Sequence, residues 1–314
     1  MPTRAERIEG GLIGLLVGDA LGVPYEFSEP STLPPLEEIE FMPPPDFART
    51  HQGTPPGTWS DDGAQALCLL DSLLTCGRFD AEDFGRRLVR WYDEGYLAVD
   101  GRVFDIGIQT GRALARLRSG VPALEAGATE ENALGNGSLM RVLPLALWHR
   151  GSDAELVADA CAQSRVTHGH LRAQVCCALY CLWARRTLGE APDPWVAAVS
   201  GLRAMFPEGR GERTELEWSL RPDDPPEGDG GGYVVATLRS ARWAQSAGSY
   251  QQIVKAAISL GRDTDTTACV AGGLAGLRDG VVAIPSRWRE ALRGMDLVQP
   301  LLMGLLKRAA AEQA

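Results

Sequence analysis

The sequence predicts an all-α fold formed by a single domain over residues 1–314. Helical periodicity dominates from Ala64 onward. Alternating strand patterns are scarce, although the segment 233–237 is also compatible with a strand. Two acidic motifs near opposite ends of the chain each precede an apolar helix. If one site uses both motifs, the whole chain must close into one domain.

The first helix is expected over residues 4–22. Gly10, Gly14, Gly18 and Gly22 recur every four residues, which predicts one helix face packed closely against another helix. Further helices are expected over residues 64–76, 81–94, 105–119, 138–150, 153–163, 171–188, 193–205, 233–247, 250–260, 266–277 and 286–312.

Two long segments lack helix and strand signals. Residues 28–58 are rich in proline and are expected to form a long loop, either a binding lid or an ordered surface wrap. Residues 207–232 are rich in Pro, Gly, Asp and Glu and are expected to form a surface insertion or mobile loop.

Composition narrows the classes of partner. The formal net charge is −10, and the arginines are dispersed among acidic residues, so we expect no nucleic-acid partner. The apolar stretches are judged too short to span a bilayer and no signal peptide is expected, so no membrane partner is predicted. Seven cysteines without a disulfide-framework spacing indicate the reducing cytoplasm.

The two acidic motifs predict a metal centre. Ser60, Asp61 and Asp62 precede the apolar run that starts at Ala64, and Asp263, Asp265 and Thr266 open a second apolar run. Four carboxylates would balance two divalent cations, and an all-oxygen donor set suits Mg²⁺ or Mn²⁺ rather than Zn²⁺. The alternative is a pair of ordinary helix caps with solvated neighbours.

Other polar residues stand at expected helix ends. The segment Gly135–Arg141 is a glycine-rich turn that opens a helix, where backbone N–H groups can hold a phosphate, although a plain N-cap role for Ser138 is favoured when this segment is taken alone. Asp105 also fits a helix cap. Asp19 is either a local hydrogen-bonding residue or an outer group of the metal site. A zinc site that joins His168 to nearby cysteines has no common spacing, so buried cysteines are preferred.

Taken in order, these motifs resemble those of the ADP-ribosylglycohydrolases, a family that includes dinitrogen-reductase-activating glycohydrolase and the ADP-ribosylhydrolases. The resemblance covers residues 10 to about 277. It is carried by Gly18–Gly22 with Pro24, Glu26 and Phe27, by Gly57–Asp62, by Asp105–Gly107, by Gly135–Arg141, by Thr167 and His168, and by Gly261–Thr266.

The resemblance implies a helical fold around two divalent cations and the hydrolysis of ADP-ribose adducts. The implied metal ligands are Ser60, Asp61, Asp62, Asp263, Asp265 and Thr266. The implied catalytic residues are Asp61, Asp62 and Asp105. The implied substrate-binding residues are Asp19, Glu26, His168 and the loop of Gly135, Asn136, Gly137, Ser138, Leu139 and Met140.

An ADP-ribosylated protein or an ADP-ribose derivative is therefore the expected partner, with arginine-linked substrates favoured. Serine-linked adducts, O-acetyl-ADP-ribose, a non-catalytic ADP-ribose binder and a metal-dependent phosphohydrolase are the alternatives. Three positions depart from the family pattern. Ser60 stands where threonine is usual, Gly63 where threonine is common, and Arg262 where glycine is frequent.

Overall fold

A computed structural model describes residues 1–311 of the chain. Within this range the structure contains α-helices, short 3₁₀ turns and one π-helical turn, with no β-strand. Two isolated bridges, Ala128 to His168 and Gly135 to Tyr233, are the β-type pairings among these residues. The all-α prediction is confirmed, and the ambiguous segment 233–237 belongs to helix α11 (Val234–Ala244).

Helices α1 (Arg4–Gly22) and α13 (Thr264–Asp279) form the centre of the fold and make the most extensive helix–helix contact. Their backbones approach so closely that a methyl group has no room. A Cβ atom on Gly14 would lie 2.6 Å from the carbonyl oxygen of Gly272, and one on Gly18 would lie 2.2 Å from that of Ala268. The glycine stripe on the first helix is thus the surface that receives α13.

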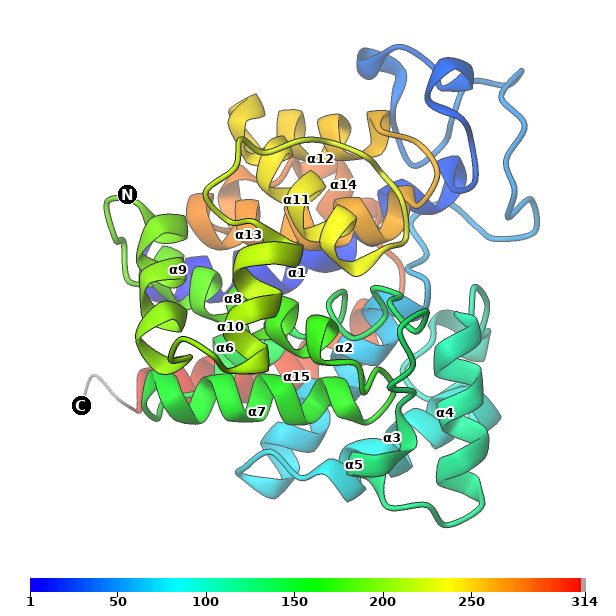
Figure 1. The fold of residues 1–314 in the computed structure, drawn as a ribbon. Coiled ribbons are helices and arrows are strands. Elements are labelled where there is room, and N and C mark those ends of the chain that lie inside the picture. The colour runs from blue at the N-terminus through cyan, green and yellow to red at the C-terminus, as the bar shows by residue number, and fades with distance from the viewer. Residues whose placement is uncertain (312–314) are drawn as a thin grey trace.

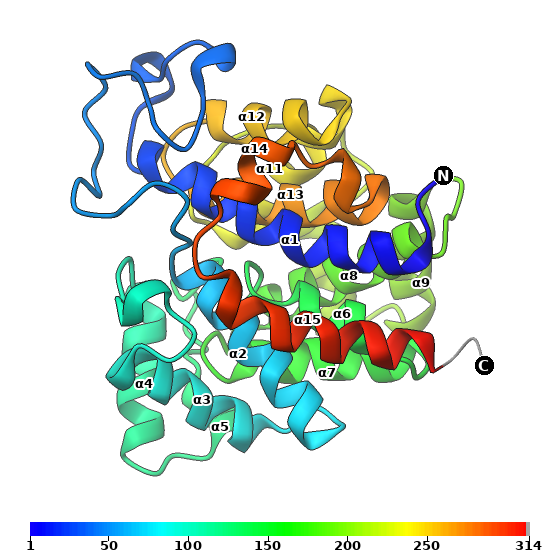
Figure 2. The same cartoon turned by 180° about the vertical axis from the view of Figure 1, so that it is seen from behind.

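The other helices surround this pair (Figures 1 and 2). One group, α11 and α12, lies along α13, with α14 against α12 and α1, and a second, α3, α4 and α5, forms a separate lobe beside α2. Helix α15 runs beside α1 on the rear face (Figure 2). The bounds of these helices are α2 Asp61–Cys76, α3 Ala81–Glu94, α4 Ile108–Arg118, α5 Ala123–Ala126, α6 Leu143–Trp148, α7 Asp153–Arg165, α8 Leu171–Leu188, α9 Pro194–Met205, α10 Gly211–Thr214, α12 Tyr250–Ser259, α14 Ser286–Ala291 and α15 Met295–Ala310.

Several predicted boundaries are wrong. The expected helix 286–312 is two helices, because the chain turns at Gly294, where φ is 68°; residue 312 lies outside the described residues. The expected helix 138–150 starts with a turn and is helical only over α6. The short helix α5 was not predicted.

The two expected loops are more ordered than their composition indicates. Residues 28–58 contain 3₁₀ turns at Pro30–Thr32 and Leu36–Glu38. Residues 207–232 contain α10 and a π-helical turn at Glu215–Leu220. Glu217 fixes this turn, because its carboxylate accepts hydrogen bonds from Arg203 and Arg213.

The expectation about apolar length is also wrong for α1. The segment Arg4–Tyr25 is long and apolar enough to cross a bilayer, with a mean hydropathy of 1.2 over its most apolar window. The structure buries 94% of that window within the fold. Such burial is typical of a core helix whose neighbours cover it on all sides.

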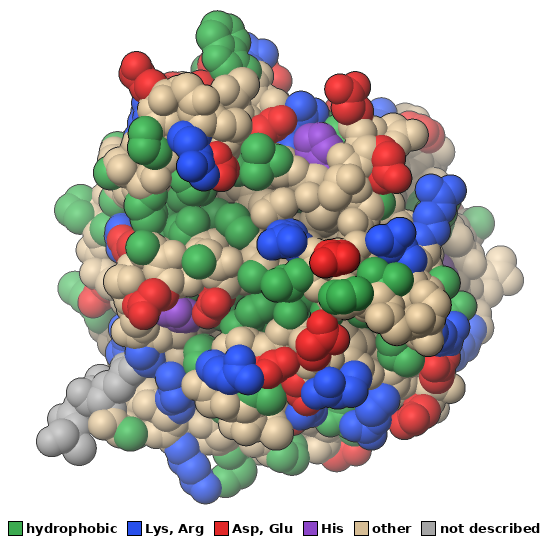
Figure 3. All heavy atoms as spheres, turned by 60° about the horizontal axis from the view of Figure 1, so that its bottom comes forward, with side chains coloured by type: hydrophobic (Ala, Val, Ile, Leu, Met, Phe, Trp, Pro, Cys, Tyr) green, Lys and Arg blue, Asp and Glu red, His purple; other side chains and the backbone are tan. Residues whose placement is uncertain are grey.

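On the face drawn in Figure 3, Lys and Arg side chains are interspersed with Asp and Glu. No broad area of a single sign is visible there. The two sets of charges thus screen one another along that face.

We predict that Gly14→Ala destabilises the protein by about 1–3 kcal/mol or more, because the added methyl group would overlap the α13 backbone. Gly111→Ala in α4 is the matched control, since a Cβ there meets no atom within 4 Å. That variant should be neutral or more stable by about 0.5–1 kcal/mol. Urea unfolding of both variants measures the difference, and equal stabilities would contradict the packing described.

Candidate functional site

A cavity of about 990 Å³ opens between the start of α13, the lobe of α3 to α5 and the loop before α6. Its size suits a dinucleotide-sized ligand. Acidic residues form one wall and a glycine-rich loop forms another. The lining residues used below are Glu26, Phe27, Asp61, Asp105, Asn136, Gly137, Met140, His168, Arg262, Asp263 and Thr266.

The start of α2 forms part of the acidic wall. Ser60 caps the helix with its side-chain oxygen, and Asp61 and Asp62 occupy its first turn, both almost fully buried. Asp19, at the end of α1, accepts hydrogen bonds from the backbone N–H groups of Ser60 (2.9 Å) and Gly63 (2.7 Å). The structure thus gives Asp19 a positioning role beneath the site, and Asp19 is not among the cavity-lining residues.

The start of α13 forms the rest of this wall and lies against the start of α2. The Thr266 hydroxyl donates to Asp62 Oδ2 at 3.4 Å, across 204 residues of sequence. Asp265 is completely buried, and its Oδ1 accepts the N–H of Thr266. The two acidic motifs that the sequence singled out are therefore neighbours in the folded chain.

These carboxylates are short of compensating charge. Burial, followed by repulsion from neighbouring carboxylates, raises the pKa values of Asp61, Asp62 and Asp265 well above their ordinary range. Burial and the nearby Asp105 likewise raise the pKa of Glu26 to about 12. Protons or cations must relieve this repulsion.

Unpartnered oxygens show that this acidic wall fits a metal ion. Asp62 Oδ1 and Asp265 Oδ2 are buried and have no hydrogen-bond partner among residues 1–311. Oxygens of Glu26, Asp263 and Asp265 lie within 4.8 Å of one another. Buried unpaired carboxylate oxygens are costly unless a cation binds them. The acidic residues can hold a metal ion, and their hard-oxygen donors suit the magnesium class.

The glycine loop, Gly135–Met140, faces the acidic wall across the cavity. Asn136 joins the two, because its Nδ2 donates to Asp263 Oδ2 at 2.7 Å. The backbone N–H of Gly137 makes no hydrogen bond within the described part of the chain, whereas Asn136 flanks the bridge between Gly135 and Tyr233. Side chains would not fit here: a Cβ on Gly137 would lie 2.8 Å from His168 Cε1. Ser138 and Leu139 of the same loop are buried behind it and do not line the cavity.

A buried arginine connects both walls from beneath. Arg141 is fully buried and donates to Gln65 Oε1 at 2.8 Å, and Gln65 in turn donates to Asp61 Oδ2 at 2.9 Å. Arg141 also donates to the Thr167 hydroxyl at 2.7 Å, which lies 2.8 Å from His168 Nδ1. Because Thr167 accepts from Arg141, its own proton is available for Nδ1.

Burial, and then the positive charge of Arg141, lowers the pKa of His168 to about 3, so the ring is neutral. Its Nε2 lies on the side of Gly135 and Gly137. If Thr167 donates to Nδ1, Nε2 carries the proton and is a donor toward the glycine loop.

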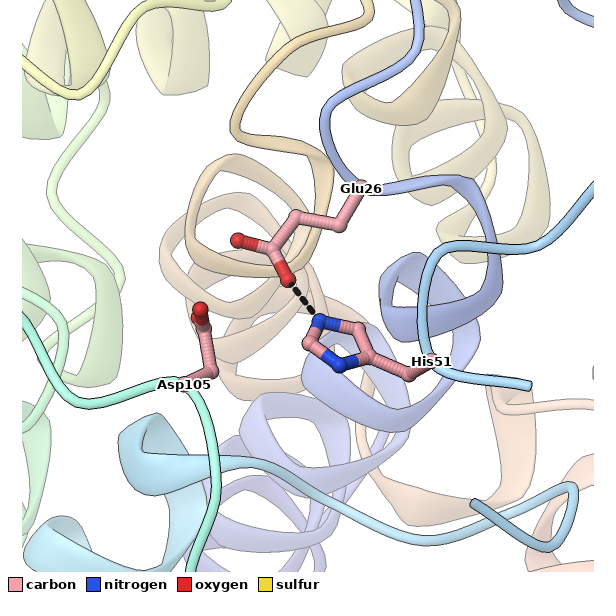
Figure 4. A group of neighbouring side chains, drawn as sticks. All are labelled: Glu26, His51 and Asp105. Atoms are coloured by element: carbon pink, nitrogen blue, oxygen red, sulfur yellow. Dashed lines mark hydrogen bonds and ion pairs between the residues drawn. The ribbon is translucent and has the colours of Figure 1, made fainter. Parts of the chain in front are cut away.

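Sequence reasoning missed His51, which lies in the long loop 28–58. Its Nε2 is 2.6 Å from Glu26 Oε2, and Asp105 faces both side chains (Figure 4). The ring of His51 also packs on Phe104, with centroids 5.2 Å apart. A lone histidine in a proline-rich loop gives no periodic signal, so only the folded chain reveals its position.

Two of the sequence departures have structural reasons. A Cβ on Gly63 would lie 2.8 Å from both Leu16 Cδ2 and Trp59 Cγ, so the packing here requires glycine. Arg262 has φ of 60°, a conformation that favours glycine. Its backbone pairs with Phe27 and Ser28, and its side chain donates to the carbonyl oxygen of Asp229 at 2.7 Å. The guanidinium also reaches the rim of the cavity.

Comparisons with known proteins agree over nearly the whole chain. The profile of the ADP-ribosylglycohydrolase family matches residues 1–314. The ADP-ribosylarginine hydrolase Tri1 of Pseudomonas putida is 33% identical over 97% of this chain and 79% of its own length. The ADP-ribosyl-(dinitrogen reductase) glycohydrolase of Rhodospirillum rubrum is 29% identical over 93% of this chain and 92% of its own.

A solved structure agrees as well. The chain titled ADP-ribosylglycohydrolase-related protein complex superposes with a TM-score of 0.77 and is 34% identical, covering 97% of this chain and 98% of its own. At this identity the likeness extends to sequence as well as fold.

Removing one buried charge should raise the stability of the metal-free protein and weaken the binding of a metal ion. We predict that Asp265→Asn raises the unfolding free energy in chelator by roughly 1–3 kcal/mol, because it relieves repulsion in the acidic wall. The same variant should lose most of the stabilisation that Mg²⁺ gives, which is about 2.7 kcal/mol at a hundredfold excess over Kd.

Thermal unfolding with Mg²⁺ and with chelator measures both effects. Asp46→Asn, on an exposed loop residue, is the control and should change neither. An Asp265→Asn variant that is destabilised in chelator and still stabilised by Mg²⁺ would contradict this account of the charges.

The low pKa of His168 predicts a pH effect on stability. A histidine whose pKa falls from its ordinary 6.5 to about 3 on folding contributes full stability above pH 6.5. This stability is lost as the pH falls from 6.5 toward 3, because the unfolded chain takes up the proton first. His168→Gln should therefore lose less stability than the wild type between pH 7 and pH 4.5 in urea unfolding. Parallel losses would show that His168 is not buried as a neutral ring.

Proposed function

Because the chain belongs to the ADP-ribosylglycohydrolase family, we propose that this hydrolase removes ADP-ribose from modified arginine side chains. The single observation that carries the proposal is the cavity, which joins a buried acidic wall to a glycine loop with an available N–H group. The arginine linkage is supported by the relative from Pseudomonas, whose name specifies ADP-ribosylarginine, and the relative from Rhodospirillum supports a modified protein as the substrate.

In this proposal the glycine loop holds the diphosphate. Gly137 lines the cavity and its N–H has no partner within the described chain, so this group can donate to a phosphate oxygen. The Nε2 of His168 lies on the side of the loop and, when it carries the proton, supports the same end of the ligand. This placement directs the distal ribose toward the carboxylates on the opposite wall.

Ser60, Asp61, Asp62, Asp263, Asp265 and Thr266 would hold two divalent cations, Mg²⁺ or Mn²⁺. When bound, such cations orient ribose hydroxyls and lower the pKa of a water molecule. Asp105, which lines the cavity, or Asp62, which lies next to it, would position a water molecule for attack at the anomeric carbon, and that carboxylate would take up the water's proton. The bond from this carbon to the guanidino nitrogen breaks, and the arginine leaves as a neutral or reprotonated guanidine. Asp61 and Asp105 stabilise the positive charge that develops on the sugar.

The direct test measures the release of free ADP-ribose from an arginine-ADP-ribosylated protein with Mg²⁺, with Mn²⁺ and with chelator. We expect release that requires the cation. Asp62→Asn should lower kcat by about a hundredfold or more, because the site loses a charged cation ligand and a candidate base for the attacking water. Asp46→Asn, outside the site, should retain wild-type turnover.

Three results would contradict the proposal in different ways. Release from serine-linked or O-acetyl substrates alone would move the activity to another linkage. Binding of ADP-ribose without turnover of any linkage would indicate a non-catalytic member. Release of AMP or inorganic phosphate would indicate a phosphohydrolase.

A further inference from the structure

A second group of potential ligands adjoins the acidic wall and shares Glu26 with it. Ligand atoms of Glu26, His51 and Asp105 all lie within 4.8 Å of one another. Figure 4 shows that the three side chains converge from three separate segments. Glu26 is almost fully buried, and His51 and Asp105 are partly buried. A mixed nitrogen and oxygen set thus stands next to an all-oxygen one.

The long loop holds His51 firmly at this position. The Thr50 hydroxyl donates to the backbone carbonyl of Glu26 at 2.9 Å, so the loop is tied to the same residue that its histidine contacts. The His51 carbonyl accepts the N–H of Thr54 at 3.0 Å, which closes a turn. Phe104, beside Asp105, packs against the imidazole ring. These contacts arrange the ligands in advance.

Glu26 belongs to both groups of ligands. Its carboxylate lies within 4.8 Å of Asp263 and Asp265 on the inner side, and of His51 and Asp105 on the outer side. Two divalent cations at the inner centre would balance Asp61, Asp62, Asp263 and Asp265. The negative charges of Glu26 and Asp105, next to the His51 imidazole, would then remain without a compensating cation.

We propose that Glu26, His51 and Asp105 form an additional cation site, selective for a borderline transition metal such as Zn²⁺, Co²⁺ or Ni²⁺. Imidazole nitrogen favours these ions, whereas Mg²⁺ prefers oxygen ligands alone. An ion at this outer site competes with the inner centre for Glu26. Because Glu26 and Asp105 line the cavity, such an ion also lies next to the space that the substrate would fill. The outer site therefore links the binding of a transition metal to the acidic wall through Glu26.

Equilibrium dialysis with Co²⁺ in a large excess of Mg²⁺ tests this proposal without any measurement of activity. Magnesium fills the all-oxygen centre, and the wild-type protein should retain one Co²⁺ per chain. His51→Gln preserves an N–H donor for Glu26 but removes the imidazole ligand. We expect that variant to bind Co²⁺ about tenfold more weakly or worse, while Mg²⁺ still raises its Tm.

His170→Asn is the matched control. His170 caps α8 by accepting the N–H of Arg172, and asparagine is a good cap, so Co²⁺ binding should not change. Asp105→Asn, a second variant on the opposite side of the site, should also lose Co²⁺. The proposal is overturned if wild-type protein retains no Co²⁺ in excess Mg²⁺, if His51→Gln and Asp105→Asn bind it normally, or if His170→Asn loses it equally. The glycohydrolase proposal stands under any of these outcomes, because none of them measures turnover.

Discussion

The close backbone contact between α1 and α13 fixes both acidic segments in space. Glycine at the contact positions lets the two helices approach until carbonyl oxygens leave no room for a methyl group. At one end of this contact the Thr264 hydroxyl donates to the carbonyl oxygen of Gly22, which sets the start of α13. One turn earlier on α1, Asp19 holds the backbone at the start of α2. The helix pair is thus the frame on which the carboxylates are mounted.

That frame brings together more negative charge than the protein itself neutralises. Arg141 is the buried cation near the acidic wall, and it reaches Asp61 only through the amide of Gln65. Because burial weakens hydration, each carboxylate raises the cost of ionising the next. The free energy of folding and the affinity for cations are therefore linked, because a cation that binds the acidic wall relieves the repulsion between its carboxylates. The clustered carboxylates thus lower the stability of the metal-free protein and, for the same reason, favour the binding of a metal ion.

The sequence predicts the parts of this arrangement that have local signals. Hydroxyl and carboxylate residues before the apolar runs indicated the starts of α2 and α13. Glycines that recur every four residues along the first helix indicated its tight contact with another helix. The sequence left two roles open for Asp19, because the choice between them depends on backbone groups of a helix 41 residues away. The resemblance alone, rather than any local pattern, placed Glu26 near the substrate. His51 was missed because its partners, Glu26 and Phe104, belong to other segments of the chain. Helix ends such as that at Gly294 were wrong because a periodic pattern continues through a turn that one left-handed residue makes.

The order of the central helices along the chain also bears on how the protein is made. Residue 264 must leave the ribosome before α1 can meet α13, and 242 residues separate Thr264 from its hydrogen-bond partner Gly22. At synthesis rates of roughly 5–20 residues per second, α1 waits on the order of 12–50 s for this partner. During that interval an apolar, glycine-lined helix is present on the nascent chain without the surface that covers it. Helices α2, α6 and α8 also contact α1 and leave the ribosome earlier, but the most extensive contact of α1 forms only after α13 has been made.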